Sequence, residues 1–344
     1  MLIYFFMLLI PLAMGLQHPL MPKKSYAGFW FYFAVLLVFC GFRFEVGTDW
    51  RGYQNIYEGT FFSGFEEALK ISEPGFFLLN KVSDWSGFEF AGVIFVGSLI
   101  FLYGCFCYAR KTVNPWLAAA AVMPYLIFII SLSGVRQACA IGIGFYLFAY
   151  WERSSLVEKV AVIAIAMSFH NSAGVLLLFV IFGMKNSAFL RVSLAAVVMA
   201  FVAYGLDKTD TFEKYKSVYI DENLISGGAF FHVLLIALPS ALYLLFRKKL
   251  VKAGLADTNV LLASILTLIA MPLLAVSSTG VDRLTLYFSF VQMWVYPALL
   301  RAGVVSRSVI RLSVAVLVMA IFFVYFLYGT HVSAYLPYKN ILFD

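Results

Sequence analysis

The chain has 344 residues, of which 63% are hydrophobic and 12% are charged. Because soluble domains carry about a quarter charged residues, this composition excludes an ordinary soluble protein and predicts an integral membrane protein. The four cysteines lie in apolar runs and show neither a disulfide framework nor the spacing of a zinc site. The formal net charge of +7 does not indicate a nucleic-acid partner, because its distribution follows membrane orientation instead.

Apolar runs that approach the ~20 residues of a spanning helix follow one another along most of the chain. They cover about 1–17, 27–42, 89–109, 115–132, 134–151, 156–169, 172–184, 191–206, 228–246, 257–278, 283–300 and 308–329. The first run lacks the basic segment and the cleavage site of a signal peptide, so we expect an uncleaved helix. The pattern predicts an all-α polytopic integral membrane protein with about 12 transmembrane helices, in which 1–344 form a single transmembrane domain.

Two polar loops are long, namely 44–87 after the second helix and 207–227. The loops on the opposite side are short and carry most of the lysines and arginines, for example at 247–252 and 301–311. Because positively charged loops stay in the cytoplasm, we expect both long loops and both termini to be extracytoplasmic. Short amphipathic helices that lie on the membrane are expected within 44–87.

The segment 156–184 decides the number of spans. It is either one long helix with His170 in its middle or two short helices that meet at Ser168–Ser172. Only the second interpretation keeps the later basic loops on the basic side, so the charge rule favours a break. Each half is too short to cross ~30 Å of hydrocarbon. We therefore expect the break to lie in a recess below the outer surface, because irregular backbone at that depth must be screened from lipid.

Polar residues gather near the outer helix ends that this topology predicts. They are Arg43, Asp49, Glu73, Arg136, His170 and Arg283. Ionisable groups near hydrocarbon are costly and indicate function. Arginine suits phosphate because its planar fork binds two oxygens, and histidine can accept a proton near neutral pH.

Each of these residues also has a structural interpretation. The arginines could reach to the interface as snorkelling side chains, Asp49 could cap a turn, and Glu73 before proline could start a helix. His170 could satisfy backbone groups at the broken helix. Tyr53 and Tyr287 have the residue type of ordinary interface aromatics. The joint pattern is stronger than any single member, because chance would scatter such residues over both faces.

Five short motifs occur in a fixed order. They are Arg43-x-x-Val46-Gly47-x-Asp49-x-x-x-Tyr53, Glu73-Pro74-Gly75-Phe76, Arg136-Gln137-x-x-Ala140, His170-x-Ser172-Ala173 and Arg283-x-x-x-Tyr287. In these motifs the sequence resembles the EpsG family of Wzy-type polysaccharide polymerases, over about 43–287. Asn171 departs from the family pattern, in which proline often follows the histidine.

The resemblance implies a membrane glycosyltransferase of GT-C-like fold. Such an enzyme joins oligosaccharide repeat units carried on undecaprenyl pyrophosphate at the extracytoplasmic face of the bacterial cytoplasmic (inner) membrane. Its product would be a surface polysaccharide such as O-antigen, capsule or exopolysaccharide. A chain-length regulator and a flippase are partners that follow from the resemblance alone, beside the membrane lipid itself.

The expected site follows from that chemistry. Arg43, Arg136 and Arg283 would bind the substrate pyrophosphate. His170 is the first candidate for the general base, followed by Asp49 and Glu73. The sugars would contact the polar and aromatic side chains Trp50, Tyr53, Gln137 and Tyr287. No metal and no cofactor are expected, because the outer carboxylates form no D-x-D pair and three arginines could replace a divalent cation.

Two other classes of function remain open. A transporter or flippase of the same lipids would need polar residues near the membrane midplane, where these helices are apolar. An O-antigen ligase or a membrane acyltransferase would share arginines and a histidine on the outer face, so the sequence separates it poorly from a polymerase. A P-loop ATPase is excluded, because the sequence contains no Gly-Lys pair.

Overall fold

The computed structural model describes residues 1–17, 26–62, 72–207 and 227–343, and all regular elements in these ranges are helices. Those of the first half are α1 (Leu2–Gln17), α2 (Ala27–Gly41), α3 (Trp50–Phe62), α5 (Pro74–Trp85), α6 (Glu89–Lys111), α7 (Pro115–Val122), the π-helix η1 (Met123–Ile130), α8 (Ser131–Ser133), α9 (Val135–Tyr150) and α10 (Leu156–Phe169).

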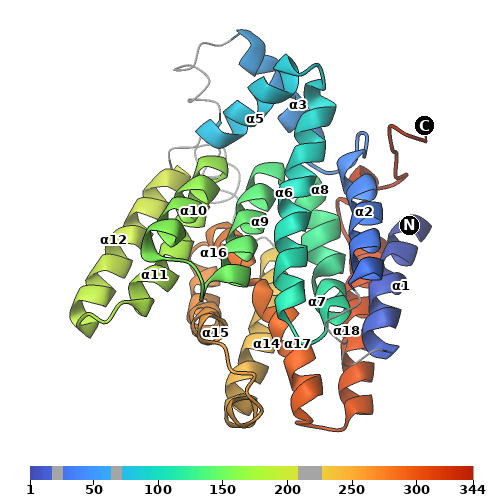
Figure 1. The fold of residues 1–344 in the computed structure, drawn as a ribbon. Helices are drawn as coiled ribbons and strands as arrows, with labels where there is room; N and C mark the ends of the chain where they lie inside the picture. The colour runs from blue at the N-terminus through green and yellow to red at the C-terminus, as the bar shows by residue number, and fades with distance from the viewer. Residues whose placement is uncertain (18–25, 63–71, 208–226, 344) are drawn as a thin grey trace.

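The second half contains the 3₁₀-helix η2 (Asn171–Leu176), α11 (Leu177–Gly183), α12 (Ala188–Asp207), α14 (Gly227–Lys252), α15 (Thr258–Ala270), η4 (Met271–Ala275), α16 (Ser278–Thr285), η5 (Leu286–Phe288), α17 (Phe290–Ala302), α18 (Arg307–Tyr328) and η6 (Val332–Ala334). Most of the helices of both halves stand side by side in one bundle (Figure 1). Helices α6 and α9 lie at its centre and touch backbone to backbone, because a methyl group at Gly104 would overlap the carbonyl of Gly142. Small residues at such crossings let apolar helices pack closely without a hydrophobic driving force.

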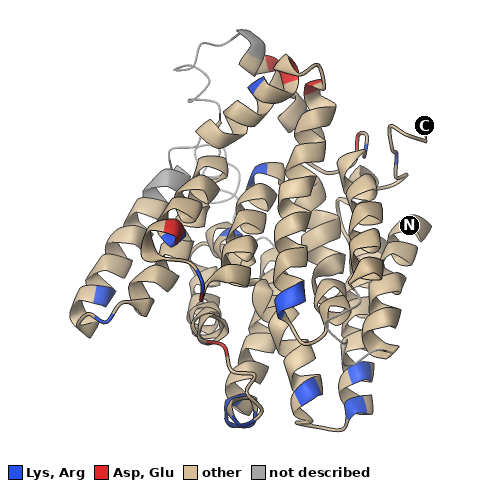
Figure 2. Cartoon of the chain, viewed as in Figure 1, with Lys and Arg blue, Asp and Glu red and all other residues tan. Residues whose placement is uncertain are grey.

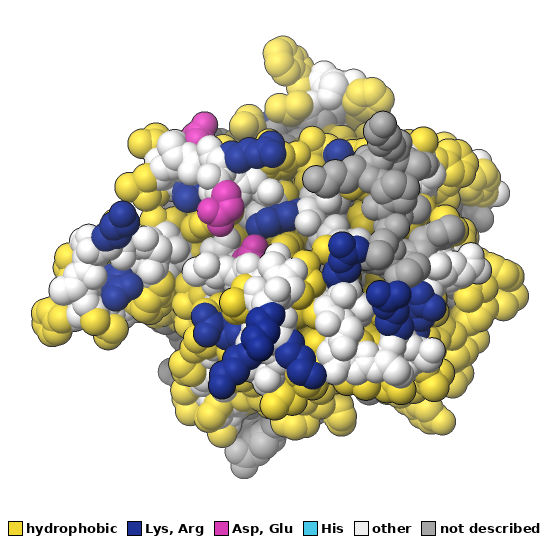
Figure 3. Space-filling view, turned by 60° about the horizontal axis from the view of Figure 1, so that its bottom comes forward, with side chains coloured by type: hydrophobic (Ala, Val, Ile, Leu, Met, Phe, Trp, Pro, Cys, Tyr) yellow, Lys and Arg dark blue, Asp and Glu magenta, His cyan; other side chains and the backbone are white. Residues whose placement is uncertain are grey.

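Charged residues separate toward the two ends of the bundle (Figure 2). The acidic end is the end where α3 and α5 lie, and it carries Glu58, Asp84 and Glu89. The basic end is the opposite end, where α14 and α17 finish and α18 begins. Clusters of lysines and arginines, with few acidic side chains, lie among hydrophobic and other side chains in the space-filling view (Figure 3). This separation is the one that the loop charges predict.

The loop after α2 folds partly into helices, as the sequence predicts, since α3 and α5 cross the acidic end (Figure 1). On α5 the exposed side chains Leu78, Val82 and Trp85 are apolar, and Trp85 is 91% exposed. Their spacing places them on one helical face. Tryptophan is typical of the interface between headgroups and hydrocarbon, so this face suits the membrane surface.

The bundle is apolar enough for a membrane protein. Five helical stretches are long and apolar enough to cross a bilayer, namely Glu89–Lys111, Pro115–Ser133, Gly228–Lys252, Thr258–Ala275 and Arg307–Tyr328. Shorter apolar helices, such as Leu2–Gln17 and Ala27–Gly41, accompany them. Length and composition of the described residues therefore support a polytopic membrane protein, whereas the expected number of about 12 spans is not confirmed.

The predicted break in 156–184 is present. Helix α10 ends at Phe169, His170 has an extended backbone with φ −158° and ψ 119°, and η2 starts at Asn171. Helix α11 then runs back to Gly183. The side chain of His170 accepts a hydrogen bond from the amide of Ser172 and so begins the second helix. The break places the imidazole at a helix junction near the acidic end.

Candidate functional site

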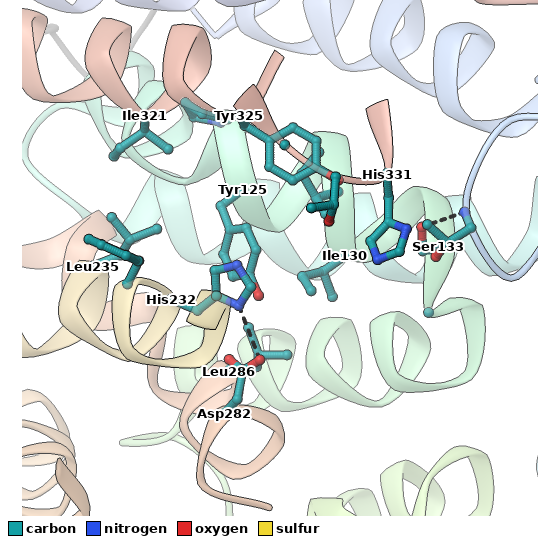
Figure 4. Close-up of a pocket in the computed structure, with 18 of the residues that line it drawn as sticks. Tyr125, Ile130, Ser133, His232, Leu235, Asp282, Leu286, Ile321, Tyr325 and His331 are labelled. Atoms are coloured by element: carbon teal, nitrogen blue, oxygen red, sulfur yellow. Dashed lines mark hydrogen bonds and ion pairs between the residues drawn. The ribbon is translucent and has the colours of Figure 1, made fainter. Parts of the chain in front are cut away.

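A cavity of about 1020 Å³ lies among the helix ends that meet at the acidic end. Its lining comes from η1 and α9, from the first turns of α14 and α16, and from the end of α18. The π-helix η1 contributes Tyr125 and Ile130 (Figure 4). Such π segments are rare in proteins, and those that do occur are often found at functional sites.

The cavity is polar on one side and apolar on the other. The polar side includes the charged or titratable residues Asp49, His232, Asp282, Arg283 and His331. The apolar side is formed by α14 and α18 and includes Phe231, Leu234, Ile321, Val324 and Tyr328. Because Phe231, Val324 and Tyr328 are also strongly exposed, this side of the cavity opens at an apolar part of the protein surface.

Three of the sequence-predicted site residues line this cavity, namely Asp49, Gln137 and Arg283. The amide nitrogen of Gln137 donates to the backbone carbonyl of Arg283 at 2.8 Å. This bond joins the start of α9 to α16, so the two motifs that contain Gln137 and Arg283 meet in space.

Arg136 and Glu73 form an ion pair and do not line the cavity, although Arg136 precedes the lining residue Gln137 in α9. The Arg136 Nη1 donates to Glu73 Oε2 at 2.7 Å, and the two side chains are 22% and 6% exposed. Tyr53 packs under the pair, with its ring centroid 5.8 Å from Arg136 Cζ. Burial raises the pKa of the Tyr53 phenol, although the positive charge of Arg136 opposes the shift. Tyr53 is therefore a neutral hydroxyl and not a proton acceptor.

His170 lies near both arginines, within electrostatic range of Arg136 and Arg283. Its Nδ1 accepts from the backbone amide of Ser172 at 3.3 Å and lies 3.0 Å from the Ser172 hydroxyl. A neutral imidazole whose Nδ1 accepts a hydrogen bond carries its proton on Nε2. This geometry makes His170 a donor through Nε2–H, and it does not support the expected role of general base.

Tyr287 supports this histidine indirectly. Its hydroxyl is 3.0 Å from the Ser172 hydroxyl, and the side chain is 1% exposed. Trp50 is also buried and packs edge-on against Phe90 at 5.1 Å between ring centroids. The structure therefore does not bring Tyr287, Trp50 or the buried Tyr53 to the cavity surface as sugar-contacting aromatics.

Arg43 differs most from its expected role. It is 1% exposed, and its guanidinium donates to the carbonyls of Val46, Cys40, Ser131 and Leu132 and to the Ser98 hydroxyl. All these partners belong to the protein, so the side chain has no face toward the cavity. Arg43 ties the turn after α2 to the end of α8 instead of binding pyrophosphate.

Gly47 brings Asp49 to the cavity. It has φ +115°, and a methyl group there would overlap the carbonyl of Leu132. The Gly47 amide donates to the Ala334 carbonyl at 2.8 Å, and the next amide, of Thr48, donates to Ser133 Oγ at 3.0 Å. The turn is thus held against two distant segments, and this contact requires glycine.

Gly47→Ala is therefore expected to destabilise the protein, because alanine is strained at this φ and its methyl group pushes the turn away from α8. The strain alone should lower the free energy of unfolding by about 1–3 kcal/mol. Thermal unfolding in detergent measures the loss. Gly52→Ala is the matched control, since nothing lies within 4 Å of a methyl group there; equal melting temperatures for the two variants would contradict the role given to Gly47.

Gly75 has a similar function in the second motif. A methyl group at this position would lie 2.8 Å from the Ser168 carbonyl oxygen and would overlap the Ser168 hydroxyl. The start of α5 therefore lies directly on the end of α10. This contact brings Glu73 to the helix break and explains why glycine follows the proline.

The sequence interpretation missed several cavity residues. His232 of α14 and His331 after α18 were not selected, nor were Tyr125 and Tyr335. A signal existed for His232, because an ionisable residue inside a predicted span indicates function. Within the part of the chain that the structure describes, no group of three or more His, Cys, Asp or Glu side chains could hold a metal ion.

The family model described as the EpsG family matches residues 27–340. No curated protein and no solved structure matches the chain significantly. The five motifs lie within the matched range, and the match covers nearly the whole chain. The protein therefore belongs to the EpsG family.

Proposed function

We propose that the protein is a glycosyltransferase that polymerises oligosaccharide repeat units linked to undecaprenyl pyrophosphate into a surface polysaccharide. The EpsG family is associated with Wzy-type polymerases, which implies a role in polysaccharide polymerisation and involvement with lipid-linked precursors.

The observation that carries the proposal is the two-sided character of the cavity. Its polar side offers Arg283, Asp49 and Gln137, whereas its apolar side is exposed between α14 and α18. A lipid-linked glycan has the same two-sided character, with a charged and hydroxylated head on a long apolar chain. The head fits the polar side, and the chain can leave through the apolar opening into the bilayer.

The two arginines suit the leaving group of this reaction. As the bond between the donor sugar and the pyrophosphate breaks, negative charge grows on the phosphate oxygen. Arg283 lines the cavity, and Arg136, which precedes the lining residue Gln137 in the chain, has a buried Nε without a hydrogen-bond partner among the described residues. Preorganised donors at such a position stabilise the transition state. His170 adds an Nε2–H donor, and Glu73 orients Arg136.

The proposed topology follows the charge separation. The acidic end, with the loop 44–87, lies outside the cytoplasmic membrane, and the basic end lies in the cytoplasm. The chain crosses about 12 times in a GT-C-like arrangement, if α10 and α11 with η2 count as two short passes that meet at His170. The second expected loop, 207–227, falls almost entirely outside the described residues. The alternation of helix ends between the two faces supports this topology.

The decisive experiment gives the purified protein in nanodiscs only undecaprenyl-pyrophosphate-linked repeat units. A polymerase produces a ladder of longer lipid-linked glycans, which electrophoresis and mass spectrometry resolve. A ligase without its separate acceptor forms no ladder, and a transporter forms no new glycosidic bond. Absence of a ladder with a folded protein and intact substrate would refute the proposed function.

Arg283→Ala should lower the rate of ladder formation by about 10²–10³-fold, the usual effect of losing a donor to a developing anion. Arg301→Ala is the matched control, because Arg301 is an exposed arginine at the basic end. A comparable loss in both variants would show that general destabilisation, and not the position of Arg283, causes the effect.

A further inference from the structure

A histidine and a carboxylate that the five motifs do not include face each other in the cavity. The Nδ1 of His232 lies 3.1 Å from Oδ2 of Asp282, and the two side chains are 27% and 20% exposed. His232 comes from the first turns of α14 and Asp282 from α16. The imidazole also stacks on Tyr125, with ring centroids 4.2 Å apart and planes at 27° (Figure 4). Its orientation is thus fixed from two sides.

The carboxylate determines which nitrogen of His232 carries the proton. A carboxylate only accepts hydrogen bonds, so Nδ1 carries the ring proton and donates a hydrogen bond to Asp282, while Nε2 keeps a lone pair. This is the reverse of His170, whose Nδ1 accepts from Ser172. Gly228 lies one turn earlier in α14, and a methyl group at this position would lie 3.4 Å from Nε2 of His232. Because glycine has no side chain, Nε2 is not crowded from this direction.

The carboxylate is also placed to stabilise positive charge that develops on this imidazole during a reaction. The second oxygen of Asp282, Oδ1, is buried and has no hydrogen-bond partner within the described residues. Within the described residues, the hydrogen bond of this carboxylate is therefore the one that His232 makes to Oδ2. As the imidazole accepts a proton, the adjacent carboxylate stabilises the imidazolium that develops. Asp49 and His331 line the same cavity. Arg283, which follows Asp282 in the chain, also lines it, and its positive charge acts against an imidazolium at His232.

We infer that His232 is the general base of the transfer reaction and that Asp282 is its positioning residue; this inference rests on the proposed function. As the acceptor hydroxyl attacks the anomeric carbon of the donor, its O–H bond breaks and the proton moves to Nε2 of His232. The new glycosidic C–O bond forms while the bond from the anomeric carbon to the phosphate oxygen breaks. The electron pair of that bond leaves with the undecaprenyl pyrophosphate.

The test is chemical rescue in the nanodisc ladder assay. His232→Ala should lower the rate by about 10²–10⁴-fold, the usual contribution of a positioned base. Added imidazole should restore part of the rate, because it can occupy the vacated space beside Tyr125. With a series of substituted imidazoles, the rescued rate should rise with the basicity of the added compound. A purely structural histidine would not produce that dependence.

Asp282→Asn should also slow the reaction, by about 10-fold or more, because an amide no longer stabilises the imidazolium. Glu152→Gln, an exposed acid outside the cavity, is the matched control. Thermal unfolding of each variant shows which of them are folded.

Three outcomes separate the possibilities. If the native protein forms no ladder, the proposed function fails. If the native protein polymerises and folded His232→Ala keeps its rate within about threefold, this inference alone fails. A lost rate in folded His232→Ala that no imidazole restores would also overturn the inference, because the site would then need the side chain for another purpose.

Discussion

Arg43→Ala is expected to lower the stability of the protein more than any substitution at the cavity surface. Arg43 is buried, and its guanidinium is the donor to four backbone carbonyls and one hydroxyl. Alanine removes one donor from each of these buried acceptors, at a cost of about 1–3 kcal/mol for each acceptor that is left unsatisfied. A total loss of several kcal/mol would leave little folded protein, since native proteins are stable by only about 5–15 kcal/mol.

The four cysteines provide the measurement. All four are buried and free, so a thiol-reactive fluorophore reports unfolding during a thermal ramp. Arg43→Lys should give an intermediate melting temperature, because an ammonium keeps the charge but cannot reach the same spread of carbonyls. Arg301→Ala should melt like the native protein. If Arg43→Ala melts normally but no longer binds the lipid-linked substrate, the arginine is a ligand after all and the structural role is wrong.

The position of Arg43 illustrates what sequence patterns leave open. An arginine at the outer end of a predicted span suggests either a phosphate ligand or a snorkelling side chain. It is neither, because the C-terminal tail covers it: Arg43 and Asn340 form an isolated β-bridge, and the Phe44 amide donates to the Lys339 carbonyl. Nearly three hundred residues separate these partners, and hydrophobic periodicity contains no information about such a contact.

Other features followed from local rules. The helix break at His170 was predicted because the loop charges on both sides of it would otherwise be inconsistent. The short helices α3 and α5 were predicted from amphipathic sequence, and the ion pair partners Glu73 and Arg136 were both in the predicted site. These predictions depend on the spacing of residues and on turn residues, which act locally, and on the net charge of whole loops. All three can be read from the sequence.

The choice between two histidines could not come from the sequence. His170 stands in a conspicuous polar motif, whereas His232 follows two phenylalanines in an apolar run. Their difference is the partner of Nδ1, which is an amide for His170 and a carboxylate for His232. Only the packing of α14 against α16 brings Asp282 to His232. The residue type alone therefore does not distinguish a histidine that donates a hydrogen bond from one that can accept a proton.

Arg136→Ala is the second substitution for which we expect a large effect. Because Arg136 forms an ion pair with Glu73, its loss should affect both stability and catalysis, and these two effects can be separated. Arg136→Ala leaves a carboxylate that is 6% exposed without its partner, which typically costs about 3–5 kcal/mol. The same change removes a donor beside the proposed pyrophosphate site, so ladder formation should fall by about 10²–10³-fold. A single variant cannot distinguish these two causes.

The double variant Arg136→Ala with Glu73→Gln distinguishes them, because glutamine is neutral and needs no cation. We expect it to recover most of the melting temperature while ladder formation per folded molecule stays low. Lys111→Met is the matched control: it breaks the 3.0 Å pair with Asp257 near the basic end, so it should lower stability and leave turnover per folded molecule unchanged. If the double variant regains activity together with stability, Arg136 serves only to neutralise Glu73, and Arg283 is then the arginine that meets the leaving pyrophosphate.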